Sequence, residues 1–214
     1  MRPAVLFARE DSIYKKLDCD VWDKKRNALN WPGGAPAVYH PPCRAWGGLR
    51  HMAKPRAGER GLALWSVCMV RIWGGVLEHP AASELWPLAK LPEPGETDVW
   101  GGWTYSAPQM WWGHRAEKPT RFYIVGITPA SLPEIPFVIG DAPCIIGTPG
   151  RRRDGTRLAP GESGWRPEVS KAEREHTPAK LANWLLEIAS KCSAPAGAVS
   201  PHSLSRSHNS AEKS

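Results

Sequence analysis

Short apolar runs, separated by polar or Pro/Gly-rich segments, recur along the first half of the chain. Pro3 to Ala8 has the pattern of a buried strand, and Cys19 to Trp22 and Ala35 to His40 give a second and a third. Arg121 to Ile127 has the clearest strand pattern of all. Apolar runs of this length, bounded by turn residues, are typical of strands inside a sheet.

Two segments show helical periodicity. From Glu59 to Trp73 apolar residues recur at helical intervals until Gly74-Gly75 ends the pattern, and Val76-Leu77 follows as a further short strand. A last helix is expected to begin with Thr177 as N-cap and Pro178 as its first residue. Its apolar face consists of Leu181, Trp184, Leu185 and Ile188.

The alternation of short strands and helices predicts an α/β fold, with a Rossmann-like, mostly parallel sheet and helices on both faces. We expect one domain over residues 1–192, because 214 residues are too few for two comfortable domains. Residues 127–166 form an Arg/Pro/Gly-rich insert with a hairpin around 137–146. Residues 193–214 are polar enough to predict a disordered tail.

The composition of the chain indicates where the protein works and what kind of partner it can bind. No apolar run approaches the roughly 20 residues of a membrane span, and the N-terminus lacks a secretory signal, which predicts a soluble, cytoplasmic protein. Five widely spaced cysteines without a C-x-x-C pair predict reduced thiols, with neither a disulfide framework nor a metal site. The net charge of +7 permits a phosphate-bearing partner.

The loop after the third predicted strand presents Cys43 directly behind Pro41 and Pro42. Two consecutive prolines hold the backbone extended, so the next side chain is presented rigidly. Arg44, Arg50 and His51 are expected to lower the pKa of the thiol and favour the nucleophilic thiolate. The alternative is a buried, inert cysteine.

Glu78 ends the apolar strand at Val76-Leu77 and precedes His79-Pro80. An acid in this position is poised to face a ligand, and partial burial suits hydrogen bonding or general-acid work on a ring nitrogen. A local ion pair with Arg71 is the alternative.

A basic turn from Trp112 to Lys118 leads into the strand that begins at Arg121. Arg115 and Arg121 are therefore candidates to steady an anionic intermediate or a phosphate.

In this order, the elements resemble the cytosine-5 DNA methyltransferase family. Pro42-Cys43 looks like its Pro-Cys nucleophile loop, Leu77 to Pro80 like its Glu-Asn-Val loop, and Trp112 to Gly126 like its arginine-containing strand segment. Arg174 to Leu181 is similar to the start of its last conserved helix. The resemblance implies transfer of a methyl group from S-adenosylmethionine to carbon 5 of cytosine in DNA.

The resemblance also implies roles for individual residues. Cys43 would add to carbon 6 of a flipped-out cytosine, Glu78 would contact ring nitrogen 3, and Arg115 or Arg121 would support the pocket. Arg44 and a basic stretch in the family's target-recognition region are expected to contact DNA. The arginines of that stretch are Arg151, Arg152, Arg153 and Arg157. Such an enzyme, of phage or mobile-element type, would act as a monomer in a bacterial or phage-infected cell.

The expected S-adenosylmethionine site lies in the loops after the first two strands. Asp23 suits a ribose hydroxyl, and Asp11 and Ser12 are expected to bind the cofactor through their side chains because the loop that starts at Arg9 contains no glycine. Phe7, Pro41 and Pro42 complete the expected set. Because the loop contains no glycine, the alternative that this site binds a different ligand stays open.

Two further interpretations remain open. One is an enzyme of another class, either a Rossmann-like nucleotide or nucleoside enzyme or a methyltransferase of exocyclic amino groups. The other is a catalytically inactive DNA-binding relative.

Overall fold

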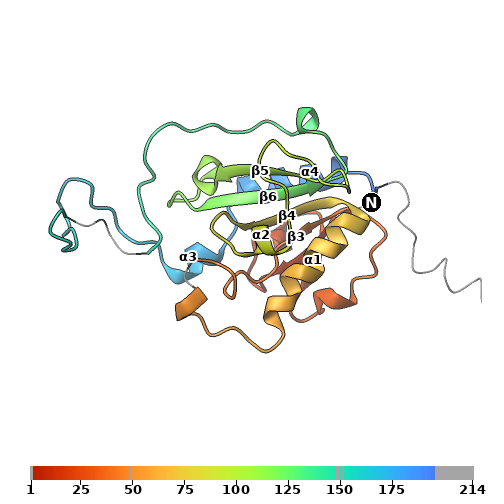
Figure 1. The fold of residues 1–214 in the computed structure, drawn as a ribbon, viewed down its shortest axis with the longest axis horizontal. Coiled ribbons are helices and arrows are strands. Elements are labelled where there is room, and N and C mark those ends of the chain that lie inside the picture. The colour runs from red at the N-terminus through yellow and green to blue at the C-terminus, as the bar shows by residue number, and fades with distance from the viewer. Residues whose placement is uncertain (1, 49, 148–149, 151, 196–214) are drawn as a thin grey trace, which may run out of the picture.

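A computed structural model describes residues 2–48, 50–147, 150 and 152–195. Its centre is a six-stranded sheet with strand order β2-β1-β3-β4-β6-β5 (Figure 1). The strands are β1 (Ala4–Ala8), β2 (Asp20–Asp23), β3 (Ala37–Tyr39), β4 (Gly75–Pro80), β5 (Trp103–Pro108) and β6 (Pro119–Val125). The α-helices are α1 (Glu59–Trp73), α2 (Leu85–Leu88), α3 (Lys171–Glu175) and α4 (Ala179–Lys191).

The sheet is mixed, so the prediction of a Rossmann-like, mostly parallel sheet is wrong. β1 pairs in parallel with β2 and β3, and β3 with β4, but the longest strands, β4, β6 and β5, pair antiparallel. Between β5 and β6 the chain makes only the 3-10 turn Gln109–Trp112. An antiparallel pair needs no more than a tight turn, whereas a parallel pair needs a long crossover.

Helices are also fewer than the alternation predicts. The β1–β2 connection holds only the 3-10 turn Ile13–Lys16, and the β2–β3 connection holds only Ala28–Asn30. The two predicted long helices are confirmed as α1 and α4. Pro178, rather than Thr177, occupies the N-cap position of α4.

The two long helices cover opposite faces of the sheet (Figure 1). Val70 of α1 shares a buried cluster with Leu77 of β4, and Leu185 of α4 shares the other cluster with Val76. Because successive strand residues point to opposite faces, Glu78 lies on the same face as Val76. The candidate acid is therefore on the α4 side of the sheet.

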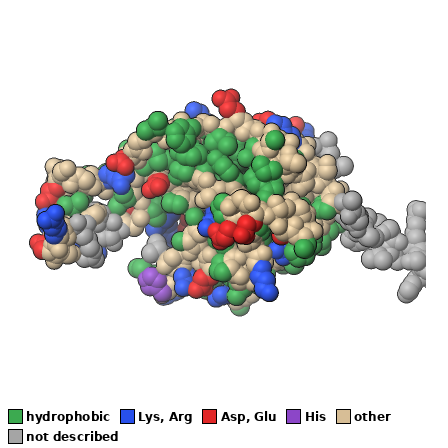
Figure 2. All heavy atoms as spheres, turned by 45° about the horizontal axis from the view of Figure 1, so that its top comes forward, with side chains coloured by type: hydrophobic (Ala, Val, Ile, Leu, Met, Phe, Trp, Pro, Cys, Tyr) green, Lys and Arg blue, Asp and Glu red, His purple; other side chains and the backbone are tan. Residues whose placement is uncertain are grey.

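Residues 127–147 run along the top of the molecule in Figure 1, and residues 152–166 belong to the loop that protrudes at its left. Hydrophobic side chains gather on the face that Figure 1 has at its top (Figure 2), and Phe137 of this segment is 67% exposed while its ring packs edge-on against Trp111. The hairpin expected around 137–146 is not formed: the chain returns through isolated bridges, Ala116 to Cys144 and Ile145 to Glu168.

The predicted tail begins with an ordered contact, because the Ser193 N–H donates to the Gly126 carbonyl at 3.0 Å. The rest of that prediction, residues 196–214, lies outside the described residues. A search of the described part of the chain finds no helix with the length and apolar character to cross a membrane.

Candidate functional site

The site forms where the pairing between β3 and β4 stops: β3 ends at Tyr39, while β4 continues to Pro80. The two strands are parallel, with Val38 beside Val76 and Tyr39 beside Leu77. The next residues of each strand, His40 and Glu78, therefore come together on the α4 face of the sheet. Cys43 follows His40 by three residues.

Glu78 is the centre of a buried polar network. One carboxylate oxygen accepts a hydrogen bond from His40 Nδ1 at 3.0 Å and the other from Gln109 Nε2 at 2.8 Å. His40 Nε2 in turn lies 2.9 Å from the Tyr14 hydroxyl, and Gln109 also contacts the Thr120 hydroxyl at 3.1 Å. The carboxylate is held in one orientation by groups from four separate segments of the chain.

The charge of Glu78 is fixed by these partners. Burial raises the pKa of its carboxyl, but the His40 hydrogen bond and the charges of His40 and Lys118 outweigh it and lower the pKa to about 2. The side chain is only 14% exposed. Glu78 is thus a nearly enclosed carboxylate that stays ionised at neutral pH, and the local pair with Arg71 is not formed: Arg71 contacts Asp98 and Tyr123 instead.

Cys43 is exposed at the surface, which contradicts the alternative of a cysteine enclosed in the core. Its carbonyl accepts hydrogen bonds from the N–H groups of Trp46 and Gly47, so the backbone turns directly after the residue. Partial burial of the sulfur raises the pKa of the thiol, because the thiolate loses contact with water. The negative charge of Glu78 raises this pKa further, and the positive charge of Lys118 lowers it. Cys43 and Glu78 are therefore electrostatic neighbours.

The expected lowering of the Cys43 pKa by nearby arginines is wrong. Arg44 is paired with Glu59 at 2.7 Å, and Arg50 is paired with Glu84 at 2.6 Å. Both guanidinium groups are thus directed toward α1 and α2 and do not act on the thiol.

Lys118 is a site residue that the sequence did not reveal. Its ammonium donates to the His176 carbonyl at 3.2 Å, and burial lowers its pKa while the charges of Glu78 and Cys43 raise it. Its backbone has φ 46, a conformation that non-glycine residues seldom adopt and that recurs at functional sites. No sequence pattern signals a positive φ in a lysine that precedes a proline.

The two candidate arginines lie elsewhere. Arg115 is 61% exposed and bonds to Glu173, at 2.7 Å from its Nε. Arg121 pairs with Glu93 at 2.8 Å. Since Arg121 is opposite His79 in the β4–β6 register, it points to the α1 face, away from Glu78.

The residues expected to bind S-adenosylmethionine do not fit it in this arrangement. The buried carboxylate of Asp23 is already used by Lys15 at 2.5 Å and by the Arg26 N–H at 3.0 Å. Ser12 caps the first 3-10 turn by accepting from the Tyr14 N–H. Both carboxylate oxygens of Asp23 and one lone pair of the Ser12 hydroxyl are therefore already in use.

The remaining expected cofactor residues are similarly engaged. Asp11 bonds to Arg9 and, at 3.0 Å, to His176, and Arg9 also pairs with Glu175. These contacts tie the end of α3 to the first loop. The other three, Phe7, Pro41 and Pro42, contribute only apolar surface, with Phe7 edge-on to the Trp65 ring.

The basic protruding loop is only partly available to a partner. Arg152 is used inside the loop, where it bonds to Glu162 at 2.7 Å and to the Arg157 carbonyl at 2.9 Å. The side chains of Arg153 and Arg157 have no ion-pair partner among the described residues. Arg151 lies outside them. The described residues also contain no cluster of His, Cys, Asp and Glu that would hold a metal ion.

No family model, curated protein or solved structure matches this chain.

His79 is a buried titratable residue on the opposite face from Glu78. It is 0% exposed, and neither ring nitrogen has a hydrogen-bond partner within the described part of the chain. Burial lowers its pKa to about 4, against an ordinary 6.5. The unfolded chain therefore binds a proton at this residue at a higher pH than the folded chain does.

This difference predicts acid sensitivity. The contribution of His79 to the free energy of unfolding is fully present above pH 6.5. The free energy of unfolding should fall by about 2 to 3 kcal/mol as the pH decreases from 6.5 to 4.5. Burial also lowers the pKa of His114, so this residue adds to the loss of stability in the same direction. Glu78 lowers the free energy of unfolding only when the pH falls further, because the pKa of its carboxyl is about 2 in the folded protein. In urea unfolding at a series of pH values, His79→Leu should remove most of this slope. The exposed His51→Leu should leave it unchanged, and equal slopes in the two variants would contradict the assignment.

Proposed function

We propose that the protein modifies cytosine in DNA through a covalent adduct between Cys43 and carbon 6 of the base, the first step of cytosine-5 methyl transfer. The observation that carries this proposal is the exposed Cys43, close enough to the enclosed, ionised Glu78 to feel its charge, where the pairing of β3 with β4 ends. Two prolines present Cys43 in the region where Glu78 and Lys118 act on its thiol, and Lys118 is the group whose charge favours the nucleophilic thiolate.

The chemistry of the step uses three groups. A sulfur–carbon 6 bond forms as Cys43 loses its proton to solvent, and the electron pair of the carbon 5–carbon 6 double bond moves toward carbon 5 and nitrogen 3. Nitrogen 3 takes up a proton from solvent, which balances the proton that Cys43 loses, and the ionised Glu78 carboxylate, oriented by His40, can accept a hydrogen bond from that N–H. The Lys118 ammonium supplies positive charge beside the thiolate and the ring.

The rest of the reaction needs a methyl donor at carbon 5. S-adenosylmethionine is the donor that the sequence resemblance implies, but its expected residues are engaged with one another, so we derive no step through it. The proposal thus concerns the adduct on DNA, with the protein acting as a monomer.

DNA is the proposed partner because two cationic side chains of the protruding loop, Arg153 and Arg157, form no ion pair with any described residue and can approach phosphates. The net charge of +7 favours association with a polyanion. Since a base must leave the stack to meet Cys43, extrusion costs a few kcal/mol that backbone contacts offset.

The adduct is tested with DNA that contains 5-azacytosine, whose ring accepts a thiol at carbon 6 without a methyl donor. We expect a covalent protein–DNA band on a denaturing gel with the unaltered protein and none with Cys43→Ser. Cys68→Ser is the matched control because Cys68 is also exposed but lies on α1. Absence of the band, or its persistence in Cys43→Ser, would overturn the proposal.

A second experiment tests whether S-adenosylmethionine is the methyl donor. Unmodified cytosine DNA is incubated with methyl-labelled S-adenosylmethionine, and label in DNA is counted. Label that depends on Cys43 extends the proposal to the whole methyl transfer. Label that survives in Cys43→Ser would contradict it and indicate methylation of an exocyclic amino group.

A further inference from the structure

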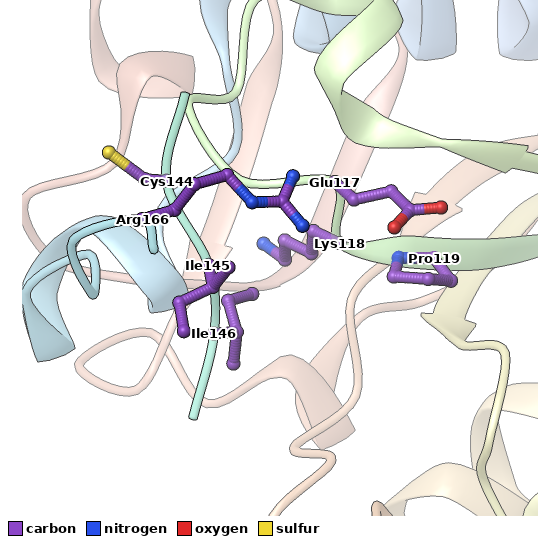
Figure 3. A pocket seen from close by; sticks show the side chains of 7 residues that line it. All are labelled: Glu117, Lys118, Pro119, Cys144, Ile145, Ile146 and Arg166. Atoms are coloured by element: carbon purple, nitrogen blue, oxygen red, sulfur yellow. The ribbon is translucent and has the colours of Figure 1, made fainter. Parts of the chain in front are cut away.

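A small recess lies beside the candidate site, between the start of β6 and the returning end of the 127–166 insert (Figure 3). Its volume is about 170 Å³. The residues around it that matter for its chemistry are Glu117, Lys118, Pro119, Ile145, Ile146 and Arg166. Lys118 belongs both to this recess and to the Cys43–Glu78 site, so the two are adjacent.

The wall formed by the insert is held in place by backbone contacts. The Cys144 N–H donates to the Arg115 carbonyl at 2.9 Å, and the Ile145 N–H donates to the Pro167 carbonyl at 2.9 Å. Cys144 is buried with Ala116 in a small apolar cluster. The recess is therefore a fixed feature of the fold rather than a gap between loops.

The recess combines flat apolar walls with polar groups of both charges. Ile145 and Ile146 line one side and Pro119 lies across from them (Figure 3). The Glu117 carboxylate has no hydrogen-bond or ion-pair partner in the described part of the chain. Arg166 uses one nitrogen on the Ala142 carbonyl at 3.0 Å, and its other N–H groups have no acceptor among the residues that the structure describes.

We propose that this recess binds the base next to the target cytosine on the same strand and that it selects guanine. The inference rests on the proposed function, because it takes its substrate from it. The Watson–Crick edge of an unpaired guanine presents two adjacent donors, the N1–H and the amino group, which suit the Glu117 carboxylate. It also presents the O6 acceptor, which suits Arg166.

The other bases match this pair of groups less well. Adenine presents one donor and an acceptor nitrogen, cytosine presents one donor, and thymine presents a single N–H between two carbonyls. Each therefore leaves part of the carboxylate unpaired. A bidentate contact of this kind discriminates between bases by about 10-fold or more.

The test uses single-stranded oligonucleotides with one 5-azacytosine and with each of the four bases on its 5′ or its 3′ side. Affinity is measured by fluorescence anisotropy with Cys43→Ser, which removes the covalent step, and adduct yield is measured with the unaltered protein. We expect guanine on one side to bind about 10-fold more tightly than the other bases. Glu117→Gln, introduced beside Cys43→Ser, should reduce this preference to about 2-fold or less.

The matched control, in the same background, is Glu134→Gln, which makes the same charge change at an exposed position outside the recess. It should retain the preference. Adducts formed equally well beside all four bases, with equal affinities, would overturn this inference and leave the proposed function standing. A guanine preference without any adduct would support the recess and overturn the proposed chemistry at Cys43.

Discussion

Replacing Gly75 with alanine is expected to lower the free energy of unfolding by about 4 kcal/mol or more. Gly75 opens β4 with φ 109, and a Cβ at this position would lie 2.0 Å from the Ala37 carbonyl oxygen and 2.6 Å from the Ala37 nitrogen. Those atoms belong to β3, the neighbouring strand. The clash cannot be relieved by a side-chain rotation, since both contacts are with backbone.

The measurement is urea unfolding followed by tryptophan fluorescence. Gly34→Ala is the matched control because Gly34 also has a positive φ, 92, but a Cβ there would meet nothing within 4 Å. The control should lose only the cost of the left-handed conformation, about 1 to 2 kcal/mol. A similar loss in both variants would show that β3 and β4 do not approach so closely.

Replacing Glu78 with glutamine is expected to slow formation of the Cys43 adduct by about 100-fold or more. The amide keeps the shape of the side chain but neither carries the negative charge nor shares a proton with His40. Since Glu78 is enclosed at the sheet edge, DNA affinity should change little. The measurement is the rate of adduct formation on 5-azacytosine DNA, together with the affinity.

Glu84→Gln is the control for this variant. Glu84 pairs with Arg50 and Arg60 at the surface, so its replacement should leave the rate unchanged. A Glu78→Gln rate equal to that of the control would remove Glu78 from the reaction.

The sequence predicted those parts of the fold that local pattern determines. The helices α1 and α4 were predicted because their apolar residues repeat with helical spacing and because Gly74 or Pro178 marks an end. The reversed direction of β6 was not predictable: an apolar run such as Phe122 to Val125 fits a parallel and an antiparallel partner equally well, and the partner is chosen by contacts distant in sequence.

The candidate site was predicted in part for similar reasons. Cys43 was found from its two prolines and Glu78 from its place at a strand end. The sequence did not identify His40 and Gln109 as partners of Glu78, because their contacts with it depend on which strands lie side by side. Arg121 is a candidate for the pocket in the sequence, but it lies on the opposite face from Glu78; a strand alternates sides at every residue, and the sequence does not show which residues of β6 share a face with Glu78.

The contacts between the end of α3 and the first loop join residues as far as 166 positions apart, from Arg9 to Glu175. All are partly exposed ion pairs, which contribute little individually and are screened by salt. Higher ionic strength should therefore weaken the contacts between the end of α3 and the first loop, including those of Asp11. It should also weaken the attraction of Arg153 and Arg157 for phosphate. Low ionic strength would therefore favour both the contact between α3 and the first loop and the proposed association with DNA.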